Sequence, residues 1–201
     1  MVLSDWFILV LACSAMSFSP GPNAMLALTT SIKSGHSKGL QLVLGGALGF
    51  AVLILCALFG LNSMVVASEQ LIDWFKVIGS GYLLYLATST WINSSKGLVE
   101  ASSEVRSGYF FKGFLLALSN PKIILFWIAF IPTIVDVSTI DFSFVLILLL
   151  TFLVIEVFAE GGLVLLGAKA QKILQKHVTR IERVSAIILA GFAVLILSAS
   201  Q

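Results

Sequence analysis

The feature that most constrains this chain is a series of six apolar stretches separated by short polar connections. They cover residues 6–31, 40–62, 72–92, 108–135, 142–168 and 184–198. A helix that crosses a membrane needs about 20 mostly apolar residues. The composition agrees, because 59% of the 201 residues are hydrophobic and 11% are charged, against about 45–50% and about 25% in soluble domains. A soluble domain and a disordered chain are therefore excluded.

The membrane environment decides the type of secondary structure. Lipid offers the backbone no hydrogen-bond partners, so the apolar stretches are expected to be helices. We expect an all-α membrane protein with six transmembrane helices, forming one transmembrane domain over residues 1–201, with the lipid bilayer as its surroundings. The net charge of +2 gives no basic footprint for nucleic acid, which is not an expected partner.

The positive charges indicate how the chain crosses the membrane. Three of the connections hold ten of the twelve Lys and Arg residues, namely Lys33, Lys38, Lys96, Arg106, Lys112, Lys169, Lys172, Lys176, Arg180 and Arg183. The connections on the opposite side hold none and carry Asp5, Glu69, Asp136 and Asp141 instead. Basic connections stay in the cytoplasm. We therefore expect a multi-pass protein with both termini outside the cytoplasm, in the periplasm or extracellular space.

Two apolar stretches, the first and the fourth, are broken near their middles by proline motifs. Proline lacks a backbone donor and leaves carbonyl groups free, which at membrane depth must face protein, water or a ligand. The two motifs lie about half the chain apart, which predicts a repeat over residues 1–95 and a second over 105–201. With three crossings each, the repeats are inverted, and paired breaks of this kind indicate a transporter's binding site. The motif residues are Pro20, Gly21, Pro22, Asn23, Asn120, Pro121 and Lys122.

Three ionisable residues also lie deep inside apolar stretches: Lys122, Glu156 and Glu160. Charged groups at this depth are costly and usually face an internal cavity. The two glutamates are one turn apart, so they lie on one helix face. A cation and a carboxylate at one level match the two poles of a zwitterion, such as an amino acid. We therefore predict substrate binding by the motif residues with Glu156, and proton coupling by Glu156 and Glu160.

Other interpretations of these residues stay open. Lys122 and Glu156 could form a buried ion pair that only fixes helix packing. The paired glutamates could hold a metal cation, which makes a metal exporter the alternative function, although a lysine at the same depth argues against it. Gly45-x-x-x-Gly49 allows close helix approach, either within one subunit or in a homodimer.

Enzymatic and redox functions are not expected. The chain carries no Gly-x-Ser-x-Gly or His-Glu-x-x-His motif of a hydrolase. A redox relay built on two halves needs a cysteine in each, whereas Cys13 and Cys56 both fall in the first half. No cofactor is expected, and no structural metal.

These motifs resemble those of the LysE/RhtB family of small bacterial amino-acid exporters over nearly the whole chain. Ser19-Pro20-Gly21-Pro22-Asn23 resembles the family's first-helix motif, and Asn120-Pro121-Lys122 resembles its Asn-Pro-Lys motif. Glu156 stands where many members carry an aspartate. Further matching positions are Gly35, Gly39, Gly45, Gly49, Lys76, Gly79, Tyr82, Leu83 and Gly162. The resemblance implies a secondary exporter of amino acids in the bacterial inner membrane, driven by proton antiport.

Overall fold

The protein is described by a computed structural model, covering residues 3–19, 21–67, 69–94, 108–135 and 140–198. All regular secondary structure within these ranges is α-helical, which confirms the predicted fold class at this level. The helices are α1 (Leu3–Phe18), α2 (Pro22–Ser34), α3 (His36–Ala67), α4 (Glu69–Asn93), α5 (Tyr109–Leu118), α6 (Pro121–Ile134), α7 (Phe142–Leu166) and α8 (Ala168–Ser198).

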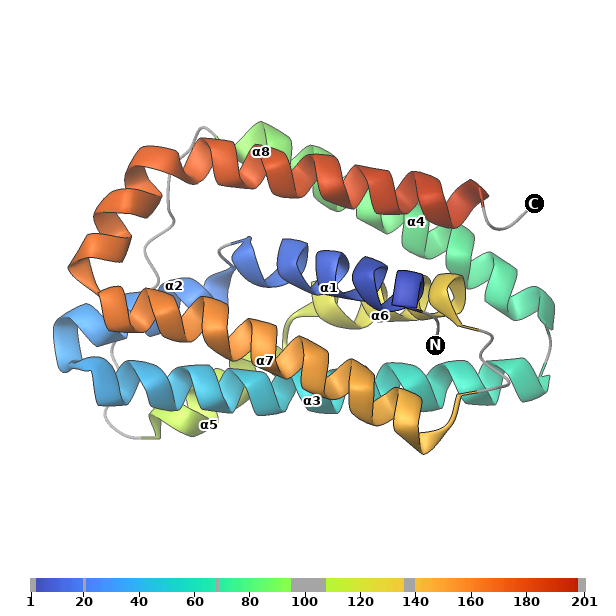
Figure 1. The fold of residues 1–201 in the computed structure, drawn as a ribbon, viewed down its shortest axis with the longest axis horizontal. Coiled ribbons are helices and arrows are strands. Elements are labelled where there is room, and N and C mark those ends of the chain that lie inside the picture. Colours follow the sequence, from blue (N-terminus) through green and yellow to red (C-terminus); the bar gives the residue numbers. More distant parts are fainter. Residues whose placement is uncertain (1–2, 20, 68, 95–107, 136–139, 199–201) are drawn as a thin grey trace.

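The helices are drawn out along one long axis (Figure 1), and basic residues gather near one of its two ends. At one end, which we call the terminal end, α1 begins and α8 ends. At the other, the basic end, α2 and α4 end and α3, α5 and α8 begin. The basic residues near these helix boundaries are Lys33, Lys38, Lys112 and Lys169. The described basic connections therefore share one end of the molecule.

The proline motifs coincide with helix boundaries inside the molecule. Helix α1 ends at Phe18, α2 begins at Pro22, and the two are inclined by 52°. Helix α5 ends at Leu118 and α6 begins at Pro121. Proline suits the first position of a helix because the N–H that it lacks would have no partner there. Both segments between helices thus lie well away from the two ends of the bundle (Figure 1).

Three helical segments are long and apolar enough to cross a membrane: His36–Leu61 of α3, α7 and α8. The bent pair α1 and α2 makes a fourth candidate. Helices α5 and α6 have only 10 and 14 residues, and α4 includes polar and charged residues. The structure therefore supports three or four spans by length and composition, and the six-span arrangement stays a prediction.

Helix α8 is much longer than the apolar stretch that predicted it. It begins at Ala168, whereas the stretch begins at residue 184. The additional turns, residues 168–183, lie at the basic end and carry the basic residues of the last connection. Hydropathy marks which part of a helix can lie in lipid, and basic residues with good helix propensity continue the helix beyond it.

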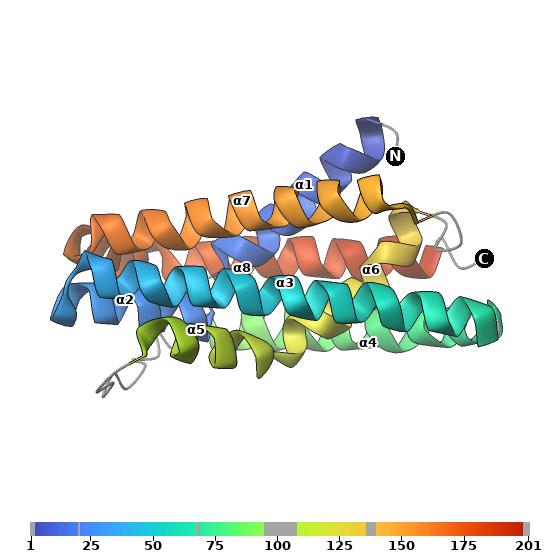
Figure 2. The same ribbon diagram turned by 90° about the horizontal axis from the view of Figure 1, so that it is seen from below.

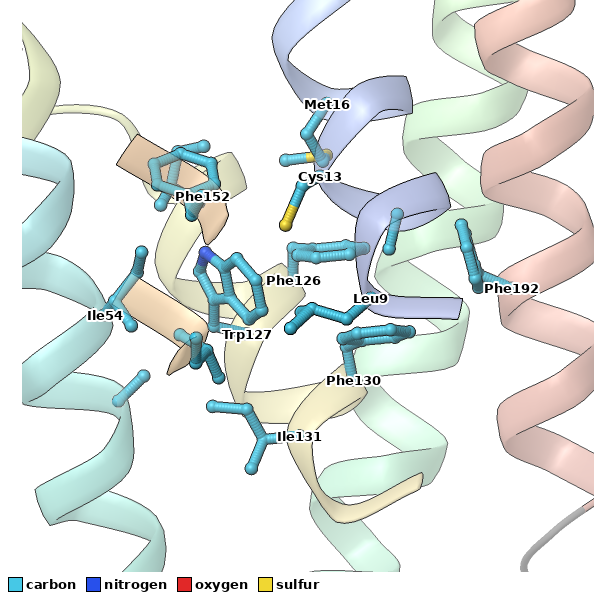
Figure 3. Close-up of a cluster of buried hydrophobic side chains, with 14 of the residues drawn as sticks. Leu9, Cys13, Met16, Ile54, Phe126, Trp127, Phe130, Ile131, Phe152 and Phe192 are labelled. Atoms are coloured by element: carbon cyan, nitrogen blue, oxygen red, sulfur yellow. The ribbon is translucent and has the colours of Figure 1, made fainter. Parts of the chain in front are cut away.

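The core contains a group of packed rings, Phe126, Trp127, Phe130, Phe152 and Phe192, which we call the aromatic cluster (Figure 3). Neighbouring rings have centroids 5.1–6.4 Å apart, mostly edge to face. Helix α6 runs from mid-molecule toward the terminal end, so the cluster fills that half of the bundle. Trp127 is fully buried.

Helices α3 and α5 approach each other closely, as seen from below in Figure 2. A Cβ atom on Gly45 would overlap the backbone of Phe110, and one on Gly113 would overlap the backbone of Leu42. A Cβ on Gly49 would lie 2.7 Å from the Phe114 carbonyl oxygen. We call Gly45, Gly49 and Gly113 the glycine seam. The close approach predicted for Gly45-x-x-x-Gly49 is therefore made within one chain, and the predicted homodimer gains no support from it.

Candidate functional site

A cavity of about 460 Å³ lies between the helices, with Ile123 of α6 and Phe50 of α3 on the side of the aromatic cluster. Its volume falls within the range of small-molecule sites, roughly 300–1,000 Å³. It is lined by Met16, Ser17, Ser19, Gly21, Pro22, Asn23, Phe50, Ser89, Thr90, Asn93, Asn120, Ile123, Glu156, Glu160 and Glu182. Both segments between broken helices and four further helices contribute to this one space.

The structure brings most of the predicted site residues to this cavity. Six of them line it: Gly21, Pro22, Asn23, Asn120, Glu156 and Glu160. Pro20 lies outside the described residues, and Pro121 and Lys122 are described only as backbone in the first turn of α6. The predicted pairing of Lys122 with a carboxylate is therefore outside what the structure describes.

The two glutamates of α7 are buried, with 5% of Glu156 and 3% of Glu160 exposed. They are one helical turn apart, and their carboxyl groups are within hydrogen-bonding reach of each other. An ionised carboxylate has no donor, so two carboxyl groups that hydrogen-bond must hold a proton between them. Burying a charged carboxylate costs free energy unless it is paired. The pair is thus a natural place to hold an exchangeable proton or a cationic group.

Asn23 connects α2 to this pair. Its Nδ2 donates a hydrogen bond of 2.7 Å to Glu160 Oε2, although the two residues are 137 positions apart. Pro22 starts the helix one residue earlier, which places Asn23 in the first turn of α2. A Cβ atom on Gly46 of α3 would overlap the Asn23 amide. The first turn of α2 on one side and the backbone of Gly46 on the other therefore hold the Asn23 side chain in place.

Three lining residues carry buried oxygen atoms with no hydrogen-bond partner among the described residues: Ser17 Oγ, Asn23 Oδ1 and Glu182 Oε2. Buried polar atoms are nearly always paired, by protein or by ordered water. Two of the three can only accept, and the hydroxyl can do both. The cavity therefore offers acceptors to a ligand that brings several N–H donors, such as an ammonium group.

The cavity is polar toward the basic end and closed toward the terminal end. Ser89, Thr90 and Asn93 belong to the last turns of α4, which ends at the basic end, and each is at least partly exposed. On the opposite side, α6 continues from Ile123 into the aromatic cluster. A ligand would therefore reach this cavity from the basic end.

Sequence reasoning missed the contributions of Ser17, Ser89, Thr90, Asn93 and Glu182. The polar group at residues 89–93 was a visible signal, because it interrupts the end of an otherwise apolar stretch. Glu182 was also visible as the one acidic residue within residues 168–183.

The described residues hold few donors for a metal ion outside the glutamate pair. Within the described ranges, no three His, Cys, Asp or Glu side chains lie close enough together to hold a metal ion. The metal alternative rests on Glu156 and Glu160, and no third donor of these types joins them in the described part of the chain.

Comparison with known proteins gives a family match. Residues 14–200 match the family model described as LysE type translocator. The chain is 34% identical over 141 residues to an uncharacterized membrane protein of Pseudomonas aeruginosa, covering 67% of this chain and 65% of that protein. No solved structure is significantly similar to this chain.

Two further relatives are leucine efflux proteins. The protein from Klebsiella pneumoniae is 32% identical over 122 residues, covering 59% of this chain and 58% of that protein. The one from Salmonella typhimurium is 32% identical over 140 residues, covering 68% of this chain and 66% of that protein. In each of these relatives the match covers less than two thirds of the relative's own length.

Proposed function

The chain belongs to the LysE type translocator family, and from this membership we propose that it exports amino acids, leucine among them, in exchange for protons. A translocator is a transport protein and not an enzyme. The name of two relatives, leucine efflux protein, supports a neutral amino acid as the substrate. The observation that carries the proposal is the cavity that joins both broken segments to the two buried glutamates.

The cavity chemistry suits a zwitterion. The substrate's ammonium group would bind Glu156 and the unpaired oxygens of Ser17 and Asn23, which supply acceptors. Its carboxylate would bind near the start of α2, where backbone N–H groups without helical partners favour an anion. Lys122, in the first turn of α6, is the proposed second partner of the carboxylate.

The proposed architecture is six spans in two inverted halves, α1–α4 and α5–α8, with the broken pairs α1–α2 and α5–α6 as single spans. Four of the helix–helix contacts support this arrangement. Helix α1 packs on α7, and its counterpart α5 packs on α3; likewise α2 packs on α7 and α6 packs on α3. Exchange of partners between halves is what an inverted repeat would produce.

We place the basic end in the cytoplasm of a bacterium and both termini in the periplasm, with the protein in the inner membrane. Basic residues gather at that end, and basic connections stay cytoplasmic. The cavity would then receive its substrate from the cytoplasm, which is the direction that export requires.

Proton coupling follows from competition for the glutamate pair. Facing the cytoplasm, the pair would release a proton and Glu156 would bind the substrate's ammonium group, which compensates the buried negative charge. Facing the periplasm, a proton from outside would neutralise the pair, and the amino acid would leave. One cycle moves substrate out and at least one proton in.

The test is uptake of radiolabelled leucine into inverted membrane vesicles that are acidified inside. Uptake driven by the pH gradient is expected with the unmodified protein and lost with Glu156→Gln and Glu160→Gln. Phe158→Leu, on the same helix with 81% of its side chain exposed, is the matched control and should retain uptake. Gradient-driven uptake at the unmodified level in both glutamine variants would overturn proton coupling. Competition by divalent cations, and none by amino acids, would favour the metal alternative.

A further inference from the structure

We propose that Asn23 senses the protonation state of Glu160 and converts it into a change of affinity for the substrate's ammonium group. The idea rests on the proposed function and assigns to Asn23 the step that links proton to substrate. A side-chain amide has a donor side and an acceptor side, and only one of them can face Glu160 at a time.

The geometry fixes the amide when Glu160 is ionised. A carboxylate only accepts hydrogen bonds, so Asn23 must turn its NH₂ group to Glu160, as the 2.7 Å bond from Nδ2 to Oε2 records. Oδ1 is then left buried and without a partner among the described residues, in a residue that lines the cavity. In this state Asn23 offers an acceptor to a ligand's ammonium group.

Protonation of Glu160 permits the opposite arrangement. A neutral carboxyl group can donate its O–H, so the amide can turn by half a rotation and accept that bond with Oδ1. The NH₂ group then faces the ligand, and a donor opposite an ammonium group is unfavourable. The residue cannot shift instead of turning, because the bare backbone of Gly46 lies directly against the amide.

The other charged and titratable groups around Glu160 have different roles. Glu156 is on the same helix and within hydrogen-bonding reach. Cys13 of α1 interacts electrostatically with Glu156, and Glu182 of α8 lines the same cavity. Helices α2 and α3 bring no titratable side chain to the cavity lining, and the Lys122 side chain of α6 lies outside the described part. Asn23 donates the hydrogen bond that joins Glu160 to α2.

The orientation of the Asn23 amide determines whether protonation of Glu160 raises or lowers the affinity for the substrate. Binding is strong while Glu160 is ionised and weak once it is protonated, so a proton arriving from the periplasm lowers the affinity for the substrate. Replacing an acceptor by a donor opposite a charged group is expected to change the affinity about tenfold or more.

The experiment is a double-mutant cycle on the full-length protein in lipid nanodiscs. Calorimetry gives the dissociation constant of L-leucine at two pH values. About pH 8 lies well above the ordinary ionisation range of a glutamate, and about pH 5 lies close to it. The ratio of the two constants is compared in the unmodified protein, Asn23→Ala, Glu160→Gln and the double variant. Titration of Glu156 and Glu182 contributes to all four ratios and cancels in the cycle.

Glu160→Gln should reduce the ratio about tenfold more in the unmodified background than in the Asn23→Ala background, where only its effect on Glu156 remains. Its affinity at high pH should stay near that of the unmodified protein, because glutamine can still accept from Asn23. An equal reduction in both backgrounds would mean that Glu160 acts on leucine directly, and the inference would be wrong. Leucine binding by none of the proteins would instead contradict the proposed function.

Two further variants protect the result against misfolding. Asn23→Ser keeps a small polar side chain at the start of α2 but cannot bridge to Glu160, so it replaces Asn23→Ala if that protein does not give a single peak in size exclusion. Ser17→Ala removes another unpaired cavity oxygen and leaves the Asn23–Glu160 pair intact. It should weaken leucine binding at both pH values and keep the ratio of the unmodified protein.

Discussion

Gly46 illustrates how a residue without a side chain can shape a binding site. It lies on α3, and a Cβ atom there would overlap the amide of Asn23. Asn23 in turn reaches Glu160 through a single hydrogen bond. The amide thus occupies the space that any other residue at position 46 would fill.

Gly46→Ala is therefore expected to displace Asn23 and to lower leucine uptake into vesicles about 10- to 100-fold, the value of one hydrogen bond to a charged group. Gly60→Ala makes the same change on the same helix, where nothing lies within 4 Å of the new Cβ, and should transport normally. Normal uptake by Gly46→Ala would mean that the placement of Asn23 is unimportant.

Glu182 belongs to the part of the cavity that includes the end of α4. Its Oε2 atom is buried and unpaired among the described residues, so it can attract an ammonium group arriving from the basic end. Glu182→Gln should raise the KM for leucine about threefold, as expected for one partly exposed charge pair, with the maximal rate unchanged. Arg180→Gln, an exposed position on the same helix, is the control. A fall in maximal rate without a change in KM would assign Glu182 a role after binding.

Among single residues, the sequence pointed to the cavity residues that stand in a strong local pattern and missed those that do not. Asn23 and Asn120 stand in proline motifs, and Glu156 is a charge in the middle of an apolar stretch. Ser17 and Asn93 are single polar residues in helices, which are common in membrane proteins. Only the packing of α1 and α4 around the cavity distinguishes them, and that packing depends on contacts across the whole chain.

Among the elements, the glycine seam joins the most extensively packed pair of helices, α3 and α5. Gly113→Ala would press a methyl group against the backbone of Leu42, and backbone cannot rotate away as a side chain can. Overpacking of this kind costs about 1–3 kcal/mol, so the melting temperature in detergent should fall.

The control for this change is Gly191→Ala on α8, where a new Cβ meets nothing within 4 Å. Without a clash, alanine favours a helix over glycine by about 0.5–1 kcal/mol, so the melting temperature should rise or stay constant. A Gly113→Ala protein as stable as Gly191→Ala would contradict the tight approach of α3 and α5.

The helical class was predictable because apolar stretches in lipid have to be helical, and two helix boundaries coincide with proline motifs. The break before Pro22 and the start at Pro121 fall where the motifs are. The start of α8 was not marked by hydropathy, because the segment from Ala168 to Arg183 is polar and still helical. The partner of Gly45 was equally out of reach, since a small-residue pattern predicts a close neighbour but not which one.

For the whole molecule, the separation of a basic end from a terminal end leads to a prediction of orientation (Figure 1). A cysteine-free background is made with Cys13→Ser and Cys56→Ser, and single cysteines are added as Lys169→Cys and Ser198→Cys. A membrane-impermeant maleimide should label only Ser198→Cys in spheroplasts and only Lys169→Cys in inverted vesicles, because basic connections stay in the cytoplasm. Labelling of both positions from the same side would contradict the proposed six spans.

The seam between α3 and α5 has a mechanical consequence for any cycle that exposes the cavity alternately to the two sides. At Gly45 and Gly113 the main chain of one helix lies directly against the main chain of the other, which opposes a sliding motion. Helices α3 and α5 would therefore move together as one rigid body during the transport cycle. The part that would separate is the aromatic cluster, where the indole N–H of Trp127 is buried without a partner among the described residues. The free energy needed to separate these rings would then set the barrier of each transport cycle.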